Sequence, residues 1–196
     1  MDDIPPGIRR LCVAVAADGI ADGGPAERQA GRERVSAALL DACGSAGLER
    51  VLVSAQHTDD TEVALLPVGI DEPRVIASLT AAMAQALHRM NNGESTRVRL
   101  RMAVHEGITI LTPDGFTGQA VARVSRLAGA QSLRAALAAD PDADLMVMLS
   151  DQVFEDVTQF GHDGLSRDRF HRAPAMIPAN GDSGAGWIYV PERPGQ

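Results

Sequence analysis

The order of strand-like and helix-like segments constrains the fold of this chain more than any other feature of its sequence. Short apolar runs and two-residue alternation are typical of strands, and they occupy residues 11–17, 50–54, 62–67, 97–105, 108–111, 145–149 and 187–190. Apolar residues at three- and four-residue spacing predict helices, here over 27–46, 73–91, 118–139 and 151–160. Residues 161–186 are rich in Gly, Pro, Asp and Arg, so we expect mostly loop there.

The resulting order is β-α-β-β-α-β followed by β-α-β-α-β. The first six elements match the ferredoxin-like split βαβ arrangement, an α+β fold in which an antiparallel sheet carries helices on one face. The chain has 196 residues and shows no internal repeat or linker. We therefore expect a single domain over residues 1–196, with a core at about 10–160 and a C-terminal tail at 161–196.

Composition excludes several classes of protein. A net charge of -8 disfavours nonspecific nucleic-acid binding, and no apolar run approaches the ~20 residues of a membrane-spanning helix. The acidic N-terminus lacks the apolar stretch of a signal peptide. Cys12 and Cys43 lie in apolar segments without metal-ligand spacing. They are expected to be buried hydrophobic residues, and the chain to be cytoplasmic.

The absence of lysine narrows the possible chemistry. All 18 basic residues are arginine. A P-loop, an SxxK hydrolase site and every Schiff-base mechanism need a lysine amine, so these classes are excluded.

Asp18 ends the apolar run 11–17 and precedes a glycine-rich loop. It is either a turn residue or a metal ligand held on the rigid end of a strand. In a split βαβ core the first and third strands are neighbours, and Asp60 comes just before the third. Antiparallel pairing would bring the two carboxylates together, where they share a proton or a cation. Mg²⁺ takes one or two carboxylates together with phosphate oxygens, so the pattern favours two-metal phosphoryl or nucleotidyl transfer.

Several short motifs follow one another along the chain. They are DGIAD at 18–22, the acidic pair at 59–60, RMAVHEG at 101–107, GQAVARVSRL at 118–127 and SDQVF at 150–154. In order and spacing they resemble the catalytic domain of class III nucleotidyl (adenylyl or guanylyl) cyclases, in a divergent, actinobacterial-type form. The resemblance covers roughly residues 10–160.

This resemblance implies a function in cyclic-nucleotide signalling. A nucleoside triphosphate would be converted to a 3′,5′-cyclic nucleotide and pyrophosphate at a site shared between the chains of a homodimer. Asp18, Asp60 and Ile20 match metal-site positions for two Mg²⁺ or Mn²⁺ ions. Arg126 matches the arginine that stabilises charge on the phosphate, and it would come from the other chain.

Several positions depart from the family pattern, and the phenylalanine of the first motif is absent. Ala122 stands where the family has an asparagine that orients the ribose, and Gln56 stands where adenylyl cyclases have a base-selecting lysine. Gly115 falls near the position of the base-selecting acid. The base preference is therefore not expected to be clearly adenine. The alternative is a catalytically silent cyclase-fold module that binds a nucleotide or a partner protein for signalling.

Simpler interpretations exist for several candidates. Asp60 is equally a solvated loop acid and Arg126 a surface arginine. The alternating Arg97, Arg99 and Arg101 are expected to form a solvated strand face, with contact to a triphosphate as the rarer reading. His105 is expected to be a structural histidine at a strand end.

Overall fold

The computed structural model describes residues 5–19, 24–48, 56–58, 61–92, 97–159, 161–162, 164–176 and 183–192. The elements, in chain order, are β1 (Gly7–Ala17), α1 (Pro25–Ser45), β2 (Gln56–Thr58), β3 (Thr61–Leu65), α2 (Glu72–Asn91), β4 (Leu100–Thr112), β5 (Gly115–Thr117), α3 (Gln119–Ala128), α4 (Gln131–Ala139), β6 (Leu145–Ser150), α5 (Asp151–Thr158), a 3₁₀ turn (Arg167–Arg169), β7 (His171–Met176) and β8 (Ser183–Tyr189).

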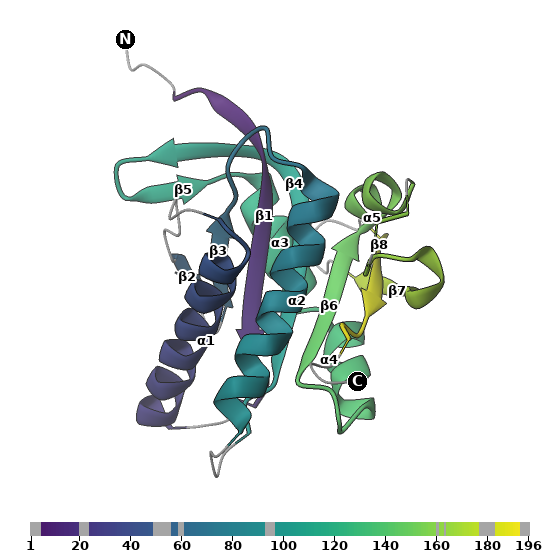
Figure 1. Ribbon diagram of the computed structural model, residues 1–196. Helices are drawn as coiled ribbons and strands as arrows, with labels where there is room; N and C mark the ends of the chain where they lie inside the picture. The colour runs from purple at the N-terminus through teal and green to yellow at the C-terminus, as the bar shows by residue number, and fades with distance from the viewer. Residues whose placement is uncertain are drawn as a thin grey trace.

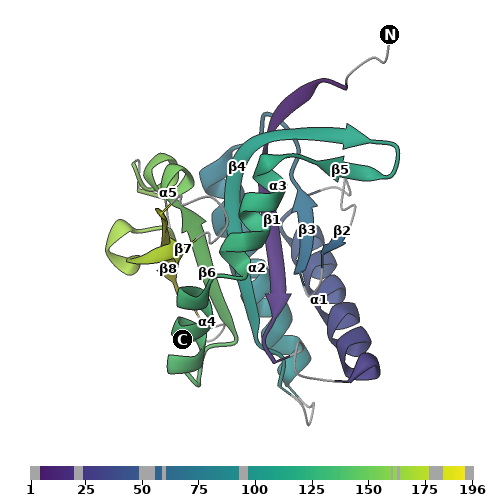
Figure 2. The same cartoon turned by 180° about the vertical axis from the view of Figure 1, so that it is seen from behind.

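The strands form one sheet in the order β2-β3-β1-β4-β6-β8-β7, with β5 paired to the far end of β4. β1 lies antiparallel between β3 and β4, whereas β4 and β6 are parallel. Helices α1 and α2 cover one face of the sheet (Figure 1). Helices α3 and α4 cover the other, as the reverse view in Figure 2 shows. The predicted α+β core is confirmed, and the second helical layer is an addition to it.

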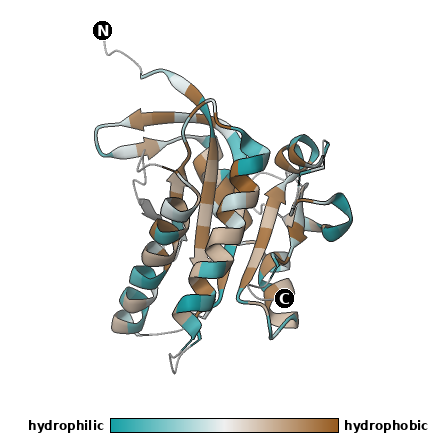
Figure 3. Cartoon of the chain, in the orientation of Figure 1, coloured by the Kyte–Doolittle hydropathy of each residue, from teal (hydrophilic) through white to brown (hydrophobic). Residues whose placement is uncertain are grey.

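Strand alternation divides the core between the two faces. Odd-numbered residues of β1 such as Val13 pack toward α1 and α2, and even-numbered residues such as Cys12 and Ala14 pack toward α3 and α4. The central strands are predominantly hydrophobic in Figure 3, while the outer faces of α1 and α2 carry hydrophilic residues. Both cysteines are buried and free, as predicted.

A group of aromatic side chains anchors the C-terminal strands on the sheet. Trp187 stacks on Phe154 of α5 with ring centroids 3.8 Å apart, and Phe170 packs against both Phe154 and Tyr189. The indole Nε1 of Trp187 donates to Asp151 Oδ1 at 2.7 Å. These contacts join β8 and α5 into one packed unit.

Four predicted elements differ from the structure. The two segments expected at 97–105 and 108–111 are the single strand β4. The helix expected at 118–139 is two helices that separate at Gly129 and Ala130. The tail expected to be loop contains β7 and most of β8. Part of the expected loop 56–61 is β2, and the expected strand 50–54 lies outside the described residues.

Candidate active site

Asp18 lies immediately after β1, at the end of a buried strand. Its backbone N–H donates to the Arg99 carbonyl at 2.9 Å, and Gly19 follows with a φ of 75°, a conformation that suits glycine in a turn. The Asp18 side chain is 35% exposed. It continues the even-numbered series of β1, whose buried members pack toward α3. Asp18 thus begins a turn and presents an accessible carboxylate, and its role as a metal ligand stays a prediction.

The predicted pairing of the first and third strands is confirmed. β1 and β3 are antiparallel, and their register places Ala16 opposite Thr61. Thr61 follows Asp60 directly in the sequence. Asp60 and Ile20 lie outside the described residues. The meeting of Asp18 with Asp60, and the metal-site role of Ile20, therefore stay predictions.

Arg101 is the closest charged neighbour that the structure gives Asp18. Its Nε lies 3.8 Å from Asp18 Oδ1, and its side chain is only 4% exposed. The guanidinium also donates to two backbone carbonyls, that of Ala128 at 2.6 Å and that of Ala17 at 3.2 Å. It thereby ties the last turn of α3 to the end of β1. The expectation of a solvated arginine is wrong here, because α3 and α4 cover this face of the sheet.

Arg99 and Arg97 are likewise held by the protein. The Arg99 side chain donates to the carbonyls of Leu137, Asp140 and Ala143. Arg97 forms an ion pair with Asp144 and donates to the carbonyls of Pro141 and Asp142. Carbonyls at a helix end and in the loop after it need donors, and these arginines supply them. Arg97 and Arg99 therefore fix the α4–β6 connection, although the Arg97 side chain is still 43% exposed, as expected of a solvated residue.

His105 is a buried structural residue, as predicted, although it lies within β4 rather than at a strand end. Its Nδ1 lies 3.0 Å from Ser150 Oγ. Burial, with smaller contributions from the positive charges of Arg123 and Arg9, lowers the pKa of His105 to about 4. A neutral imidazole is therefore part of the folded state at neutral pH.

Two glycines of the motifs allow α3 to approach β4. A Cβ at Gly118 would lie 2.6 Å from the Ile108 carbonyl oxygen, and the φ of this residue is 135°. A Cβ at Gly107 would lie 2.9 Å from the Ala120 Cβ. These contacts give both glycines a packing role, which sets the position of α3 on the sheet.

Ala122 and Arg126 share the outer face of α3. Both are exposed, and residues four apart lie on the same side of a helix. Arg126 also lines a groove of about 630 Å³ between α3, the start of α4 and Pro174 of β7. Asp18 does not line this groove. Within one chain, therefore, the candidate catalytic arginine faces outward.

Gly115 lies at the opposite end of the sheet from Asp18. In the register of β1 and β4, Ala17 is opposite Leu100 and Gly7 is opposite Ile110, and Gly115 pairs with Thr112 still farther along. At about 3.4 Å per residue the two ends are more than roughly 30 Å apart. Figure 1 shows the β4–β5 hairpin extending from one end of the sheet while β1 finishes at the other. One nucleotide cannot reach Asp18 and Gly115 of the same chain.

Gln56 lies in β2, two strands from β1 in the sheet, with its Cα opposite Val63 of β3. The registers place Gln56 level with Ala14 of β1, four residues or roughly 13 Å before Asp18 along the strand direction, which is much nearer to Asp18 than Gly115 is. The structure thus brings together the strands that carry Asp18 and Gln56, and it sets Gly115 apart from both.

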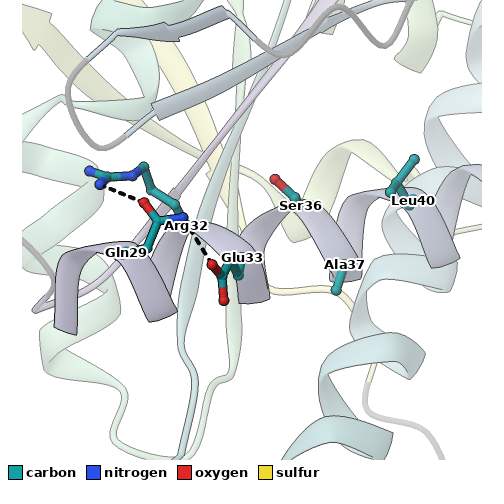
Figure 4. Close-up of a pocket in the computed structure, with 6 residues that line it drawn as sticks. All are labelled: Gln29, Arg32, Glu33, Ser36, Ala37 and Leu40. Atoms are coloured by element: carbon teal, nitrogen blue, oxygen red, sulfur yellow. Dashed lines mark hydrogen bonds between the residues drawn. The ribbon is translucent and has the colours of Figure 1, made fainter. Parts of the chain in front are cut away.

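A second groove, of about 500 Å³, runs along α1 (Figure 4). Its polar residues bind one another, since Arg32 donates to Gln29 and Gln29 donates to Glu33. Ser36 in the same groove donates to the buried carboxylate of Glu62. The groove contains no residue of the sequence motifs, so it is not the candidate active site.

The donor chemistry around Asp18 suits a hard divalent cation. An accessible carboxylate on a rigid strand end is an oxygen ligand of the kind that Mg²⁺ and Mn²⁺ take. In the part of the chain that the structure describes, no three His, Cys, Asp or Glu side chains cluster as a metal site. A site that completes its coordination with substrate phosphates needs only one or two carboxylates, so Asp18 with Asp60 would suffice.

Sequence reasoning missed Arg101 as the neighbour of Asp18. The register explains the contact, because Arg101 is opposite Ala16 on the adjacent strand and its side chain extends along the strand toward Asp18. The sequence did contain a usable signal, because the two-residue alternation puts Arg101 and Asp18 on the same sheet face once the first and fourth strands pair.

No described helix is long and apolar enough to cross a membrane.

Comparison with known proteins gives matches among solved structures. A scan against protein-family models and a search of curated proteins return no match. The adenylate/guanylate cyclase/hydrolase from Silicibacter pomeroyi superposes with a TM-score of 0.61 at 19% identity, over 95% of this chain and 100% of that one. The monomeric guanylyl cyclase domain of the RhoGC fusion protein from the aquatic fungus Blastocladiella emersonii gives a TM-score of 0.62 at 7% identity, over 97% of this chain and 100% of that one.

A third match is the guanylate cyclase domain from Catenaria anguillulae, solved in complex with GTP. It gives a TM-score of 0.57 at 10% identity, over 95% of this chain and 97% of that one. At these identities the likeness concerns the fold. The chain has the fold of class III adenylyl and guanylyl cyclase catalytic domains.

Proposed function

We propose that this protein is a nucleotidyl cyclase whose active site is shared between two chains. The observation that carries the proposal is the separation within one chain of Asp18 from Gly115, together with the outward-facing Arg126 on α3. A two-fold dimer can bring the α3 surface of one chain to the β1 end of the other. Residues that are far apart in one chain then act on one nucleotide.

The proposed reaction is an intramolecular displacement. The 3′-hydroxyl oxygen of a nucleoside triphosphate bonds to the α-phosphorus, the bond to the bridging α–β oxygen breaks, and pyrophosphate leaves with that electron pair. The 3′-hydroxyl proton passes to solvent. Asp18 and Asp60 would hold two Mg²⁺ or Mn²⁺ ions with the Ile20 backbone, and these ions would lower the pKa of the hydroxyl and neutralise the triphosphate.

Arg126 of the second chain would stabilise the charge that develops on the phosphate. An arginine in this role is worth about 10³–10⁵ in rate. Ala122 offers no hydrogen bond to the ribose, and one such donor is worth about 10²–10³. We therefore expect slow turnover that Mn²⁺ favours over Mg²⁺.

Base selection should be weak. Gln56 carries no charge and Gly115 no side chain, whereas strong discrimination requires a site built to hydrogen-bond one base. ATP is therefore not expected to be strongly preferred over the other nucleotides.

Solved structures with the same fold support a nucleoside triphosphate as the ligand, and they include both monomers and dimers. The Catenaria anguillulae domain binds GTP. The Blastocladiella emersonii domain has been crystallised in a monomeric form and in a non-canonical dimeric form. By analogy with these folds, the ligand would be a nucleoside triphosphate and the assembly a homodimer formed from weakly associating chains.

The test is an incubation of the protein with Mn²⁺ and each of the four nucleoside triphosphates, followed by measurement of pyrophosphate and cyclic nucleotide. Asp18→Ala is the control that should abolish turnover. Production of a cyclic nucleotide that depends on Asp18 supports the proposal. Mn²⁺-dependent binding of nucleotide with no product contradicts it and favours the catalytically silent module.

A further inference from the structure

We propose that Arg101 makes the divalent cation bind together with the triphosphate rather than before it. This inference rests on the proposed function and concerns the order in which that site is filled. It starts from the guanidinium of Arg101, which lies 3.8 Å from the carboxylate of the proposed metal ligand Asp18.

The guanidinium is fixed in this place. The Arg101 side chain is 4% exposed, and it is held by the carbonyls of Ala128 and Ala17, which belong to different elements. Burial and two backbone contacts prevent a simple swing of the side chain into solvent. Any cation on Asp18 therefore binds beside a permanent positive charge.

The distance sets the size of the effect. A metal ion about 2.1 Å from Asp18 Oδ1 lies no more than about 6 Å from the Arg101 Nε, because this oxygen is the one in the 3.8 Å contact. At that distance a unit charge repels a divalent ion enough, in surroundings as polar as water, to weaken its binding roughly tenfold. The effect is larger where solvent is partly excluded.

The triphosphate reverses the sign of this interaction. A complex of one divalent cation with a nucleoside triphosphate carries net negative charge, so Arg101 attracts the complex although it repels the bare ion. Arg101 thus weakens binding of the free divalent cation and strengthens binding of the complex of the cation with the triphosphate. Arg101 is a positioning and electrostatic residue in this account, acting through Asp18 and through the end of α3.

Arg99 provides a matched control. It lies two residues before Arg101, just ahead of β4, and also donates to backbone carbonyls, those of the α4–β6 region. Arg99→Met removes an arginine with a similar set of hydrogen bonds, while the 3.8 Å contact with Asp18 belongs to Arg101. Arg101→Lys retains the positive charge with fewer donors.

The experiment measures Mn²⁺ binding by electron paramagnetic resonance of the free ion, with and without α,β-methylene analogues of ATP and GTP, whose α–β bond is not cleaved, and a protein-free titration corrects for the Mn²⁺ that each analogue binds by itself. For the wild type we expect Mn²⁺ alone to bind at least about tenfold more weakly than Mn²⁺ with an analogue. Arg101→Met should bind Mn²⁺ alone at least about tenfold more tightly than the wild type does. Arg101→Lys and Arg99→Met should retain the wild-type order, and circular dichroism checks that each variant is folded.

The outcomes are distinguishable. If the wild type binds Mn²⁺ equally well with and without the analogue, or if folded Arg101→Met leaves Mn²⁺ affinity unchanged, the binding order is refuted while the proposed function stands. If Mn²⁺ does not bind even with an analogue, the proposed function fails and the order fails with it. If Arg101→Met does not fold, the wild-type comparison still tests the binding order, and Arg101→Lys against Arg99→Met tests whether the order depends on the Arg101 position.

Discussion

Replacing His105 tests the account of the buried face between β4 and α3. The imidazole is 7% exposed, its Nδ1 lies 3.0 Å from Ser150 Oγ, and its pKa is lowered to about 4. In the unfolded chain its pKa returns to the ordinary value of 6.5. Below pH 6.5 the unfolded chain therefore binds a proton that the folded chain does not accept until about pH 4.

The sign and the size of the effect follow from this difference. Between pH 6.5 and pH 4, protons bind the unfolded state in preference to the folded state. The stabilising contribution of the neutral His105 to the free energy of unfolding is therefore fully present above pH 6.5 and is lost as the pH falls toward 4. The full difference corresponds to about 3 kcal/mol at roughly 1.36 kcal/mol per pH unit. Between pH 7 and pH 5 the loss in the free energy of unfolding should be about 2 kcal/mol.

The assay is urea unfolding at pH 7 and pH 5, followed by circular dichroism and by the fluorescence of Trp187. His105→Asn removes the titrating group and retains a polar side chain that can reach Ser150. The wild type should lose about 2 kcal/mol more than this variant between the two pH values. His88→Asn, which removes an exposed histidine from α2, should behave as the wild type. An equal loss in the wild type and His105→Asn would refute the reasoning.

Three further predictions follow from the placement of α3 and of the nucleotide contacts. Gly118→Ala should lower the free energy of unfolding by about 2–4 kcal/mol, because its Cβ meets the Ile108 carbonyl oxygen at a φ of 135°; a loss below about 0.5 kcal/mol in urea unfolding would contradict the close packing. Mixing inactive Asp18→Ala chains with inactive Arg126→Ala chains should restore about a quarter of wild-type turnover, because about half of the dimers are then mixed and each mixed dimer has one intact site of two. If the chains are shown to exchange and no turnover returns, the shared site is contradicted. Gln56→Ala should change the ratio of kcat/KM values among the four nucleotides more than the maximal rate, and an unchanged ratio would remove Gln56 from the base pocket.

The central strands could be predicted because their sequences carry one strong signal each. The apolar run of β1 and the alternation of β4 define their buried faces, and the split βαβ order then requires β1 and β3 to be neighbours, as found. The turn between β4 and β5 was recognisable from its Pro-Asp-Gly sequence. These features depend on local pattern and on a topology with few alternatives.

β7 was not predictable in the same way. Its sequence, HRAPAM, contains a proline and shows no clear alternation, and proline is tolerated in sheets at an edge strand. β7 is the last strand of the sheet, so Pro174 occupies a permitted position. Edge location is a property of the assembled sheet and cannot be read from six residues.

The alternating arginines at the start of β4 show the same limit for the candidate site. The pattern of Arg97, Arg99 and Arg101 could not tell that Arg101 is covered by helices later in the chain while Arg97 stays exposed. The carbonyls that bind these side chains belong to residues 17, 128, 137 and 140–143. Long-range contacts of this kind decide whether a charged residue is a surface group or a structural one.

The separation of Asp18 from Gly115 also required the structure. The motif that begins at Asp18 and the position of Gly115 follow the family order in the sequence, which suggests a common site. The register of β1 with β4 instead places them at opposite ends of the sheet. This geometry turns the expectation of a dimer into a requirement of the proposed function.

The most direct test is a crystal structure of the protein with Mn²⁺ and an α,β-methylene nucleoside triphosphate, with manganese located by its anomalous scattering. The account predicts manganese about 2.1 Å from carboxylate oxygens of Asp18 and Asp60, the triphosphate beside it, and Arg126 of a second chain facing the α-phosphate. Manganese bound away from Asp18, or Asp18 and Asp60 on opposite faces of the sheet, would contradict the central claim.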